Sequence, residues 1–227
     1  MMRKVFYKEW AYVLGMIAVA IATAFTEKAN LGLSMVVAPA YQIHLIFSPA
    51  FPIITFGTAI YIFQGILLLL MCLVVRRFRV SYLYSFVTAV LYGYLLDLVM
   101  IPVSFIQADA LWVRIVLYIA GITICSIGIS LMFHTYIKPE VYELFVKEVS
   151  DRFSININRV KIVYDVLSCL LAVAISLVVF GEILGIGVGT IICVFVNGIM
   201  IGAFSKLFEK HFEFKTRFPK FEKIMLE

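Results

Sequence analysis

The sequence predicts an all-α fold: a polytopic transmembrane helical bundle whose six spans form a 3+3 inverted repeat, with an interfacial or re-entrant segment in each half. Three observations predict it. The chain is 63% hydrophobic and only 15% charged, its apolar residues gather in runs long enough to cross a bilayer, and its basic residues gather between those runs. Its mean hydropathy of +1.05 is far from that of a soluble protein. A single membrane domain over residues 1–227 is therefore expected.

Each span is predicted from an apolar run of roughly the 20 residues that a helix needs to cross the hydrocarbon core. The first run follows basic residues, as a secretory signal does, but no small-residue cleavage pattern follows it and further runs come after it. We therefore expect it to be a retained helix. The six runs are Trp10–Thr26, Ile53–Val75, Val80–Phe105, Leu111–Phe133, Ile162–Phe180 and Ile183–Ser205.

The segment Ala29–Phe51 is a seventh candidate span that the distribution of charge argues against. With six crossings and both termini cytoplasmic, every Lys and Arg except Lys28 and Arg114 lies on the inside. A seventh crossing would move the basic cluster Arg76–Arg79 to the outside. The polar backbone at the start of this segment cannot face lipid either. We therefore expect a re-entrant or interfacial segment on the outer side.

The inner loop Lys138–Asn158 predicts an amphipathic helix on the cytoplasmic face. Apolar residues recur there at steps of three and four. Glu143 with Lys147 and Glu148 with Arg152 are spaced as i,i+4 charge pairs. The tail, residues 207–227, carries phenylalanines among charges and is also predicted to be cytoplasmic and interfacial.

The order of element types repeats, which predicts two related halves. Repeat one covers about 10–105 and repeat two about 111–206, each with a span, a half-polar segment and two further spans. Because each half crosses three times, the second enters from the opposite side, which gives an inverted repeat of the kind found in transporters. A duplication that is only evolutionary history is the alternative. The matched positions are Gly15 with Gly121, Phe63-Gln64 with Tyr164-Asp165, and Tyr92-Gly93 with Asn197-Gly198.

Polar residues within or beside the spans are the candidate substrate-binding residues. Burying a polar side chain in a membrane costs free energy, so such residues are rare and often mark functional sites. Asn30 or Ser34 is expected to cap a short helix whose N-terminal end faces an anionic group. Asp97 and Asp165 are expected to bind a cationic group or couple proton movement. Solvation of Asp97 near the outer end and a simple Lys161–Asp165 pair remain the alternatives. The complete candidate set is Asn30, Ser34, Gln64, Asp97 and Asp165.

Small residues at helical spacing on the last span predict close helix packing. The candidate helix-packing glycines are Gly185, Gly189, Gly198 and Gly202. Neither a catalytic residue, a metal site nor a cofactor is predicted, because paired metal cysteines and the HExxH and GxSxG motifs do not occur. The protein is therefore not expected to be an enzyme. An intramembrane enzyme would need an acid and base pair such as Asp97 and Asp165.

Three motifs resemble the YczE/YyaS/YitT-type family of bacterial integral membrane proteins. They are Lys28-Ala29-Asn30-Leu31-Gly32-Leu33-Ser34, Arg159-Val160-Lys161 leading to Asp165, and Gly185-Ile186-Gly187 with Gly189-Thr190. Met35 and Ile199 stand where family members often carry proline. The resemblance implies a protein of the bacterial cytoplasmic (inner) membrane that moves or senses a small metabolite, with a vitamin-like molecule as one candidate.

The sequence thus favours a transporter-like protein that binds and moves a small metabolite through a midplane site between inverted repeats. The alternative is a non-transporting membrane subunit or sensor that binds a partner protein. The expected partners are the lipid bilayer and an unknown small-molecule substrate, with a homo-oligomer left open. Nucleic acid is not expected, because the basic residues sit at span ends rather than along one face.

Overall fold

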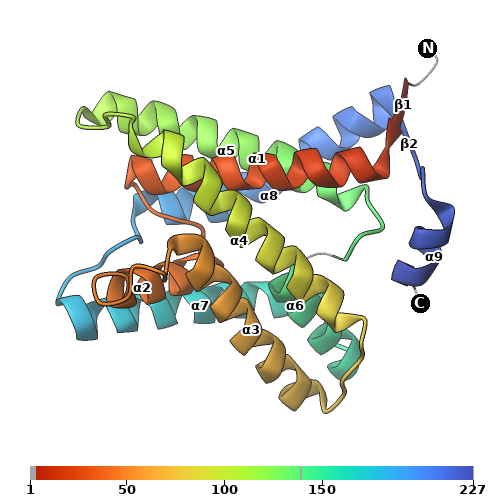
Figure 1. Cartoon of the computed structure of the whole chain (residues 1–227), viewed down its shortest axis with the longest axis horizontal. Coiled ribbons are helices and arrows are strands. Elements are labelled where there is room, and N and C mark those ends of the chain that lie inside the picture. The colour runs from red at the N-terminus through yellow and green to blue at the C-terminus, as the bar shows by residue number, and fades with distance from the viewer. Residues whose placement is uncertain (1–3, 139, 227) are drawn as a thin grey trace. The chain divides into compact units, whose positions relative to one another are not determined.

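The protein is a predominantly helical membrane protein, and the part of the chain that the structure describes has six helices long and apolar enough to cross a bilayer. The computed structural model in Figure 1 describes residues 4–138 and 140–226. The predicted helical fold class and the number of candidate spans are confirmed. The spanning helices are α1 (Lys8–Ala29), α3 (Phe56–Val75), α4 (Tyr82–Ser104), α5 (Leu111–Phe133), α7 (Ile157–Phe180) and α8 (Val188–His211).

The remaining elements are short. Helix α2 (Ala38–Phe47) has 10 residues and so is about 15 Å long, half of the roughly 30 Å of a hydrocarbon core. Helix α2 is therefore too short to cross by itself, and the re-entrant or interfacial placement of Ala29–Phe51 stays a prediction. Helix α6 (Val141–Phe153) fills the loop where an amphipathic helix was expected. The other elements are β1 (Lys4–Tyr7), β2 (Phe212–Lys215) and α9 (Pro219–Leu226).

The chain divides into two compact units, and each unit takes segments from both halves of the sequence. The first unit comprises the chain up to Asn30, Leu98–Ile137 and the chain from Ile191 onward; the second comprises Leu31–Asp97 and Lys138–Thr190. The predicted repeats are therefore not the compact units. Every contact described below lies within one unit.

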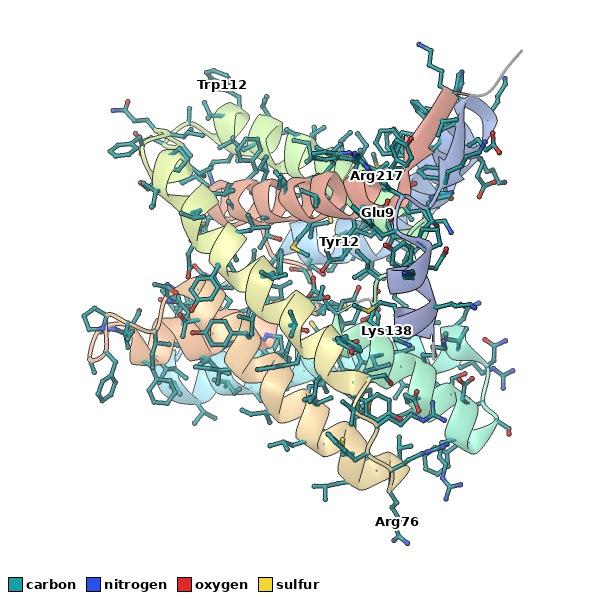
Figure 2. All side chains as sticks on the ribbon, turned by 45° about the vertical axis from the view of Figure 1, so that its right-hand side comes forward. Glu9, Tyr12, Arg76, Trp112, Lys138 and Arg217 are labelled. Carbon is teal, nitrogen blue, oxygen red and sulfur yellow. The ribbon has the colours of Figure 1, made fainter. Side chains whose placement is uncertain are left out.

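In the first unit, α1 and α5 pack side by side and antiparallel (Figure 1). A Cβ atom on Gly15 would lie 2.8 Å from the carbonyl oxygen of Gly128, and one on Gly121 would lie 3.1 Å from that of Ala22. These glycines let the two backbones approach closely, as small residues do in membranes. Trp112, near the start of α5, is 69% exposed and points away from the unit (Figure 2), a position typical of a membrane interface.

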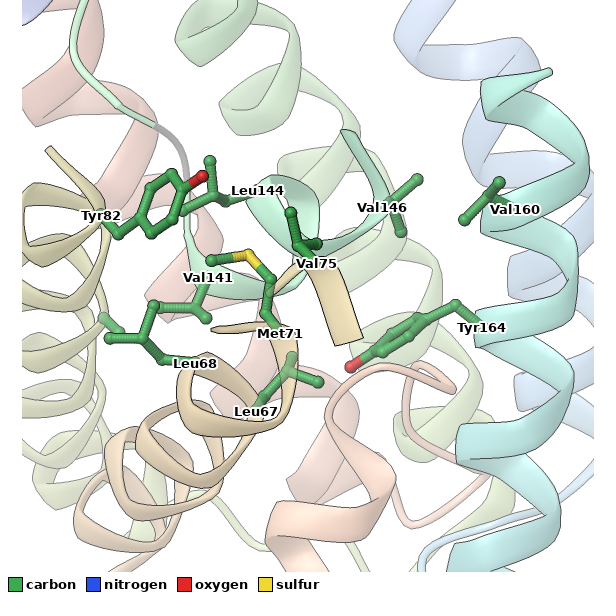
Figure 3. Close-up of a cluster of buried hydrophobic side chains, with 11 residues drawn as sticks. Leu67, Leu68, Met71, Val75, Tyr82, Val141, Leu144, Val146, Val160 and Tyr164 are labelled. Carbon is green, nitrogen blue, oxygen red and sulfur yellow. The ribbon is translucent and has the colours of Figure 1, made fainter. Parts of the chain in front are cut away.

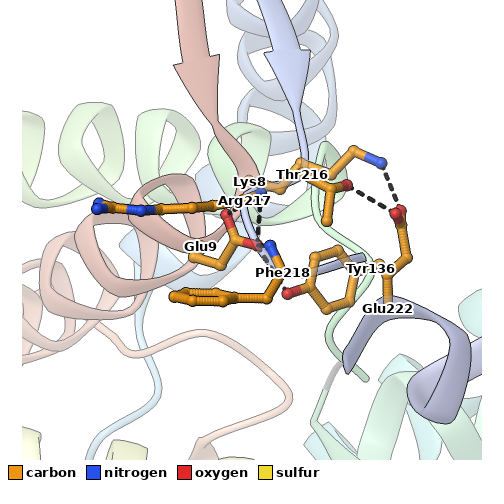
Figure 4. Close-up of polar contacts among 7 residues, drawn as sticks. All are labelled: Lys8, Glu9, Tyr136, Thr216, Arg217, Phe218 and Glu222. Carbon is orange, nitrogen blue, oxygen red and sulfur yellow. Dashed lines mark hydrogen bonds and ion pairs between the residues drawn. The ribbon is translucent and has the colours of Figure 1, made fainter. Parts of the chain in front are cut away.

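The two ends of the chain meet in the first unit. Strand β1 pairs in parallel with β2, and the carboxylate of Glu9 accepts hydrogen bonds from the Tyr136 hydroxyl at 2.8 Å and from the backbone N–H of Arg217 at 3.0 Å (Figure 4). Lys8 pairs with Glu222 at 2.7 Å. The tail is thus bound to the start of α1. This pairing of the segment before α1 with the segment after α8 agrees with an even number of spans, as the six candidate helices give.

The second unit has its own apolar core, in which α6 packs against α3 and α7. Met71 on α3 and Val141 on α6 are fully buried there. Figure 3 shows these side chains directed toward one another. Helix α6 is therefore a packed element and not only a surface helix. The buried members of this core are Leu67, Leu68, Met71, Val75, Tyr82, Ala89, Val141, Leu144, Val146, Val160 and Tyr164.

The polar face of α6 forms contacts other than the predicted i,i+4 pair of Glu148 with Arg152. Glu148 accepts a hydrogen bond from the Tyr82 hydroxyl at 2.7 Å and lies 3.7 Å from Arg79. These partners belong to α4 and the turn before it. The periodicity of a single helix does not reveal such partners, because it carries no information on which neighbour covers the helix.

Candidate functional site

Two motifs that are distant in the sequence meet in the second unit. The backbone N–H of Leu33 donates to the carbonyl of Gly185, and that of Gly189 donates to the carbonyl of Leu31, both at 2.8 Å. A Cβ atom on Gly187 would lie 2.5 Å from the Leu31 carbonyl oxygen. The segment before α2 is thus hydrogen-bonded to the segment that leads into α8, which satisfies irregular backbone that lipid could not.

This arrangement corrects the role assigned to the glycines. Gly185 lies in the loop before α8 with φ of +72°, a left-handed conformation that suits glycine. The backbone N–H of Gly189 donates to the carbonyl of Leu31. Gly185 and Gly189 therefore do not form a helix-packing stripe on α8. Gly198 and Gly202 do lie within α8, yet among the described residues no atom outside the adjacent backbone of α8 lies within 4 Å of an added Cβ at either position. Their packing role stays a prediction.

The expected helix cap by Asn30 or Ser34 is not formed by their side chains. Asn30 ends α1 in a left-handed conformation with φ of 48°, and its backbone carbonyl accepts from Arg114. The carbonyl of Ser34 accepts from Val37 and Ala38 at 3.0 Å and so begins the turn into α2. The start of α2 has no side-chain cap. Both residues act here through their backbone, because each lies where the chain changes direction.

Asp97 on α4 holds the N-terminus of α3. Its carboxylate accepts from the Thr55 hydroxyl at 2.6 Å and from the backbone N–H of Gly57 at 2.8 Å. The first N–H groups of a helix have no partner within that helix and carry partial positive charge, so a carboxylate there is stabilising. A Cβ on Gly57 would lie 2.0 Å from the Gly93 carbonyl oxygen. The structure thus gives Asp97 a positioning role.

Gln64 has the corresponding role at the N-terminus of α6. Its side chain is 5% exposed, its amide nitrogen donates to the Glu140 carboxylate, and its Oε1 accepts from the backbone N–H of Val141 at 2.9 Å. Gln64 therefore caps α6 from a neighbouring helix. The same contact brings Glu140, just before α6, against α3.

Aromatic and acidic side chains extend this contact toward α7. The hydroxyl of Tyr142 donates to Glu143 at 3.0 Å, and its ring stacks on that of Tyr164 with 6.2 Å between centroids. The buried Oδ1 atom of Asp165 has no hydrogen-bond partner among the described residues. We call this set the acidic cluster. Its members are Gln64, Glu140, Tyr142, Glu143, Tyr164 and Asp165.

The acidic cluster favours protonated carboxyls or a bound cation. Burial raises the pKa of Glu140 to about 7, with the Gln64 hydrogen bond opposing the shift and the charge of Glu143 adding to it. Burial also raises the pKa of Glu143, against the hydrogen bond from Tyr142 and the charge of Lys161. Carboxylates in such surroundings gain from a cation nearby, and the π faces of tyrosine rings attract organic cations.

Of the predicted site residues, the structure therefore brings Gln64 and Asp165 to one cluster, which meets α3 near its middle, and leaves Asp97 at the N-terminus of α3. Sequence reasoning missed Glu140, Tyr142 and Glu143, although the matching of Gln64 with Asp165 between the repeats pointed to this region. Among the described residues, no three His, Cys, Asp or Glu side chains are grouped so that they could hold a metal ion.

Family comparison covers nearly all of this architecture. A model of a family of unknown function, DUF6198, matches residues 6–206, from β1 into α8. The chain belongs to the DUF6198 family. The acidic cluster and the loop contacts of this DUF6198 member lie within the matched range. Comparison with curated proteins and with solved structures gives no significant match, and the resemblance to the YczE/YyaS/YitT-type family stays a prediction.

Proposed function

We propose that this membrane protein is a transporter-like carrier for a small metabolite with a cationic group, and that the acidic cluster binds that group. The observation that carries the proposal is that Glu140, Glu143 and Asp165 lie in one cluster beside stacked tyrosine rings. The positive charge of Lys161 interacts electrostatically with Glu143 and with Asp165. Ionisable residues at a membrane helix that face the protein interior are typical of substrate and proton pathways.

An inverted repeat is the part of the proposal that would allow alternating access. Gly15 faces Gly128, and Gly121 faces Ala22; Ala22 follows Gly15 at the same spacing as Gly128 follows Gly121. Exchanging the two helices therefore reproduces the contact, as a two-fold axis would. The short helices agree: α2 contacts α3 and α7, while α6 contacts α7 and α3. These reciprocal contacts support the repeat.

Proton coupling follows from the chemistry of Glu140. A carboxyl that titrates near neutral pH can exchange a proton for a cationic substrate within the physiological range. We propose that the cluster carries a proton when empty and releases it when the cation binds.

Uptake into proteoliposomes tests the proposal. The full chain is reconstituted and assayed with a panel of labelled primary, quaternary and heteroaromatic ammonium compounds, with and without an inward proton gradient. We expect uptake of at least one compound, and at least a tenfold reduction in its initial rate by Glu140→Gln and by Asp165→Asn. Glu182→Gln, which removes an exposed carboxylate outside the cluster, should retain full uptake.

Two results would overturn the proposal. If folded protein moves no compound of the panel, the carrier assignment fails and a non-transporting subunit becomes the better explanation. If uptake occurs and the cluster variants transport as well as the wild type, the protein is a carrier whose binding site lies elsewhere.

A further inference from the structure

A separate basic pocket lies where α3 ends and the chain turns toward α4. It has a volume of about 430 Å³ and lies between the turn and the C-terminal half of α6. Figure 2 shows Arg76 pointing away from the end of α3. The pocket belongs to the second unit and is remote along α6 from Glu140. Its lining residues are Val75, Arg76, Arg77, Arg79, Glu148, Asp151 and Arg152.

The charges of this pocket do not cancel. Glu148 is occupied, since it accepts from the Tyr82 hydroxyl at 2.7 Å and pairs with Arg79 at 3.7 Å. Arg77 and Arg152 have no ion pair among the residues that the structure describes, and both are exposed. The four arginines outnumber the two carboxylates of the lining. The pocket therefore offers guanidinium groups to an anion.

The backbone places these arginines around one pocket. Arg76 caps α3 in a left-handed conformation with φ of 53°, and the residues after it form the tight turn into α4. Val75 is buried in the core of the second unit. Because the end of α3 and α6 share that core, the arginines of the turn and Arg152 are presented to one space by rigid helices.

The surroundings indicate a membrane surface. A spanning helix ends at Val75, so the pocket is at the level where lipid headgroups lie. Phe78 and Val80 in the same turn are 60% and 68% exposed, a combination of exposed apolar side chains and arginines that suits the boundary between acyl chains and headgroups. Guanidinium groups bind phosphate oxygens through paired hydrogen bonds.

We propose that this pocket binds a phosphate group, and that the group is supplied by the headgroup of an anionic phospholipid. Arg77 and Arg152 contact the phosphate from opposite walls, and Phe78 and Val80 lie along the acyl chains. This site is independent of the acidic cluster and of any transport activity, so its test does not depend on a substrate.

Calorimetric titration of the full chain in detergent tests the site. The probes are dihexanoyl phosphatidylglycerol, dihexanoyl phosphatidylcholine and inorganic phosphate, each alone. We expect phosphatidylglycerol to bind at least tenfold more tightly than the other two. The Arg77→Gln/Arg152→Gln double variant should weaken that binding at least tenfold. Arg159→Gln removes an exposed arginine of α7 that does not line the pocket and should bind as the wild type does.

The remaining outcomes overturn the inference in distinct ways. Equal affinity for both lipids would exclude recognition of an anionic headgroup. Tight binding of inorganic phosphate that the double variant removes would assign the pocket to free phosphate instead of lipid. Unchanged lipid binding by a double variant with wild-type melting would place the lipid elsewhere. If the double variant does not fold, Arg77→Lys/Arg152→Lys replaces it, and this charge-preserving variant should bind phosphatidylglycerol more tightly than a single Arg152→Gln variant.

Discussion

Replacing Glu140 by glutamine should stabilise the protein much more at pH 8 than at pH 5. Glutamine has nearly the shape of a protonated glutamate and keeps an acceptor for Gln64. In the wild type, the folded protein holds the Glu140 proton up to a pKa of about 7, whereas the unfolded chain loses it near 4.5. The folded state therefore binds more protons between these values, and its stability falls as the pH rises through that window.

The size of the effect follows from the pKa difference. Each unit corresponds to about 1.4 kcal/mol, so burying this carboxyl in its charged form costs about 3 kcal/mol, of which about 2.5 kcal/mol is lost between pH 5 and pH 8. For a chain of this length, a change of 1 kcal/mol shifts Tm by roughly 2–4 °C. The Tm of Glu140→Gln relative to the wild type should therefore rise by about 5–10 °C between pH 5 and pH 8.

Thermal melting in one detergent at both pH values measures the effect. The quantity of interest is the Tm difference between variant and wild type at each pH, because other titrating groups cancel in it. Glu182→Gln, at an exposed carboxylate, should give the same small difference at both pH values. If the Tm difference between Glu140→Gln and the wild type does not grow from pH 5 to pH 8, the Glu140 carboxyl is not buried against α3. Glu140 then has no raised pKa with which to couple proton movement.

Three further predictions concern packing and the chain ends. Gly57→Ala should lower Tm by several degrees because its Cβ would overlap the facing backbone, whereas Gly198→Ala, with open space at its Cβ, should not lower it; equal Tm values would contradict the close crossing. Gly187→Ala should also destabilise relative to Gly198→Ala, by about 1–3 kcal/mol in chemical unfolding. Glu9→Ala should release the tail, seen as faster proteolysis and amide exchange after β2, while the exposed Glu213→Gln should not; a tail that stays protected in Glu9→Ala would refute its role.

Hydropathy and charge predicted the spans well because membrane insertion depends on local composition. The six runs and the amphipathic helix follow from short windows of sequence. The start of the last helix was misplaced because the apolar residues from Ile183 to Gly187 continue the hydrophobic pattern, while their glycines instead form a loop held by Leu31 and Leu33.

The candidate site was predicted less well because its contacts join distant parts of the chain. Asp97 and Gln64 are conspicuous as polar residues in apolar runs, but only the register of α3 against its neighbours shows that each caps a helix end. Glu143 has the spacing of a surface charge pair, and its burial depends on α6 lying against α3 and α7. Periodicity along one helix cannot supply that information.

The pairing of β1 with β2 bears on how the chain could be circularly permuted. Because the two strands run in parallel, a linker from the end of the chain back to its beginning must retrace the length of the ribbon and α9, but it need not cross the bilayer. New ends could then be opened in the exposed turn at Arg77–Val80, between two spanning helices. Such a circular permutant would still insert an even number of helices and would retain the pairing that now closes the chain into a loop.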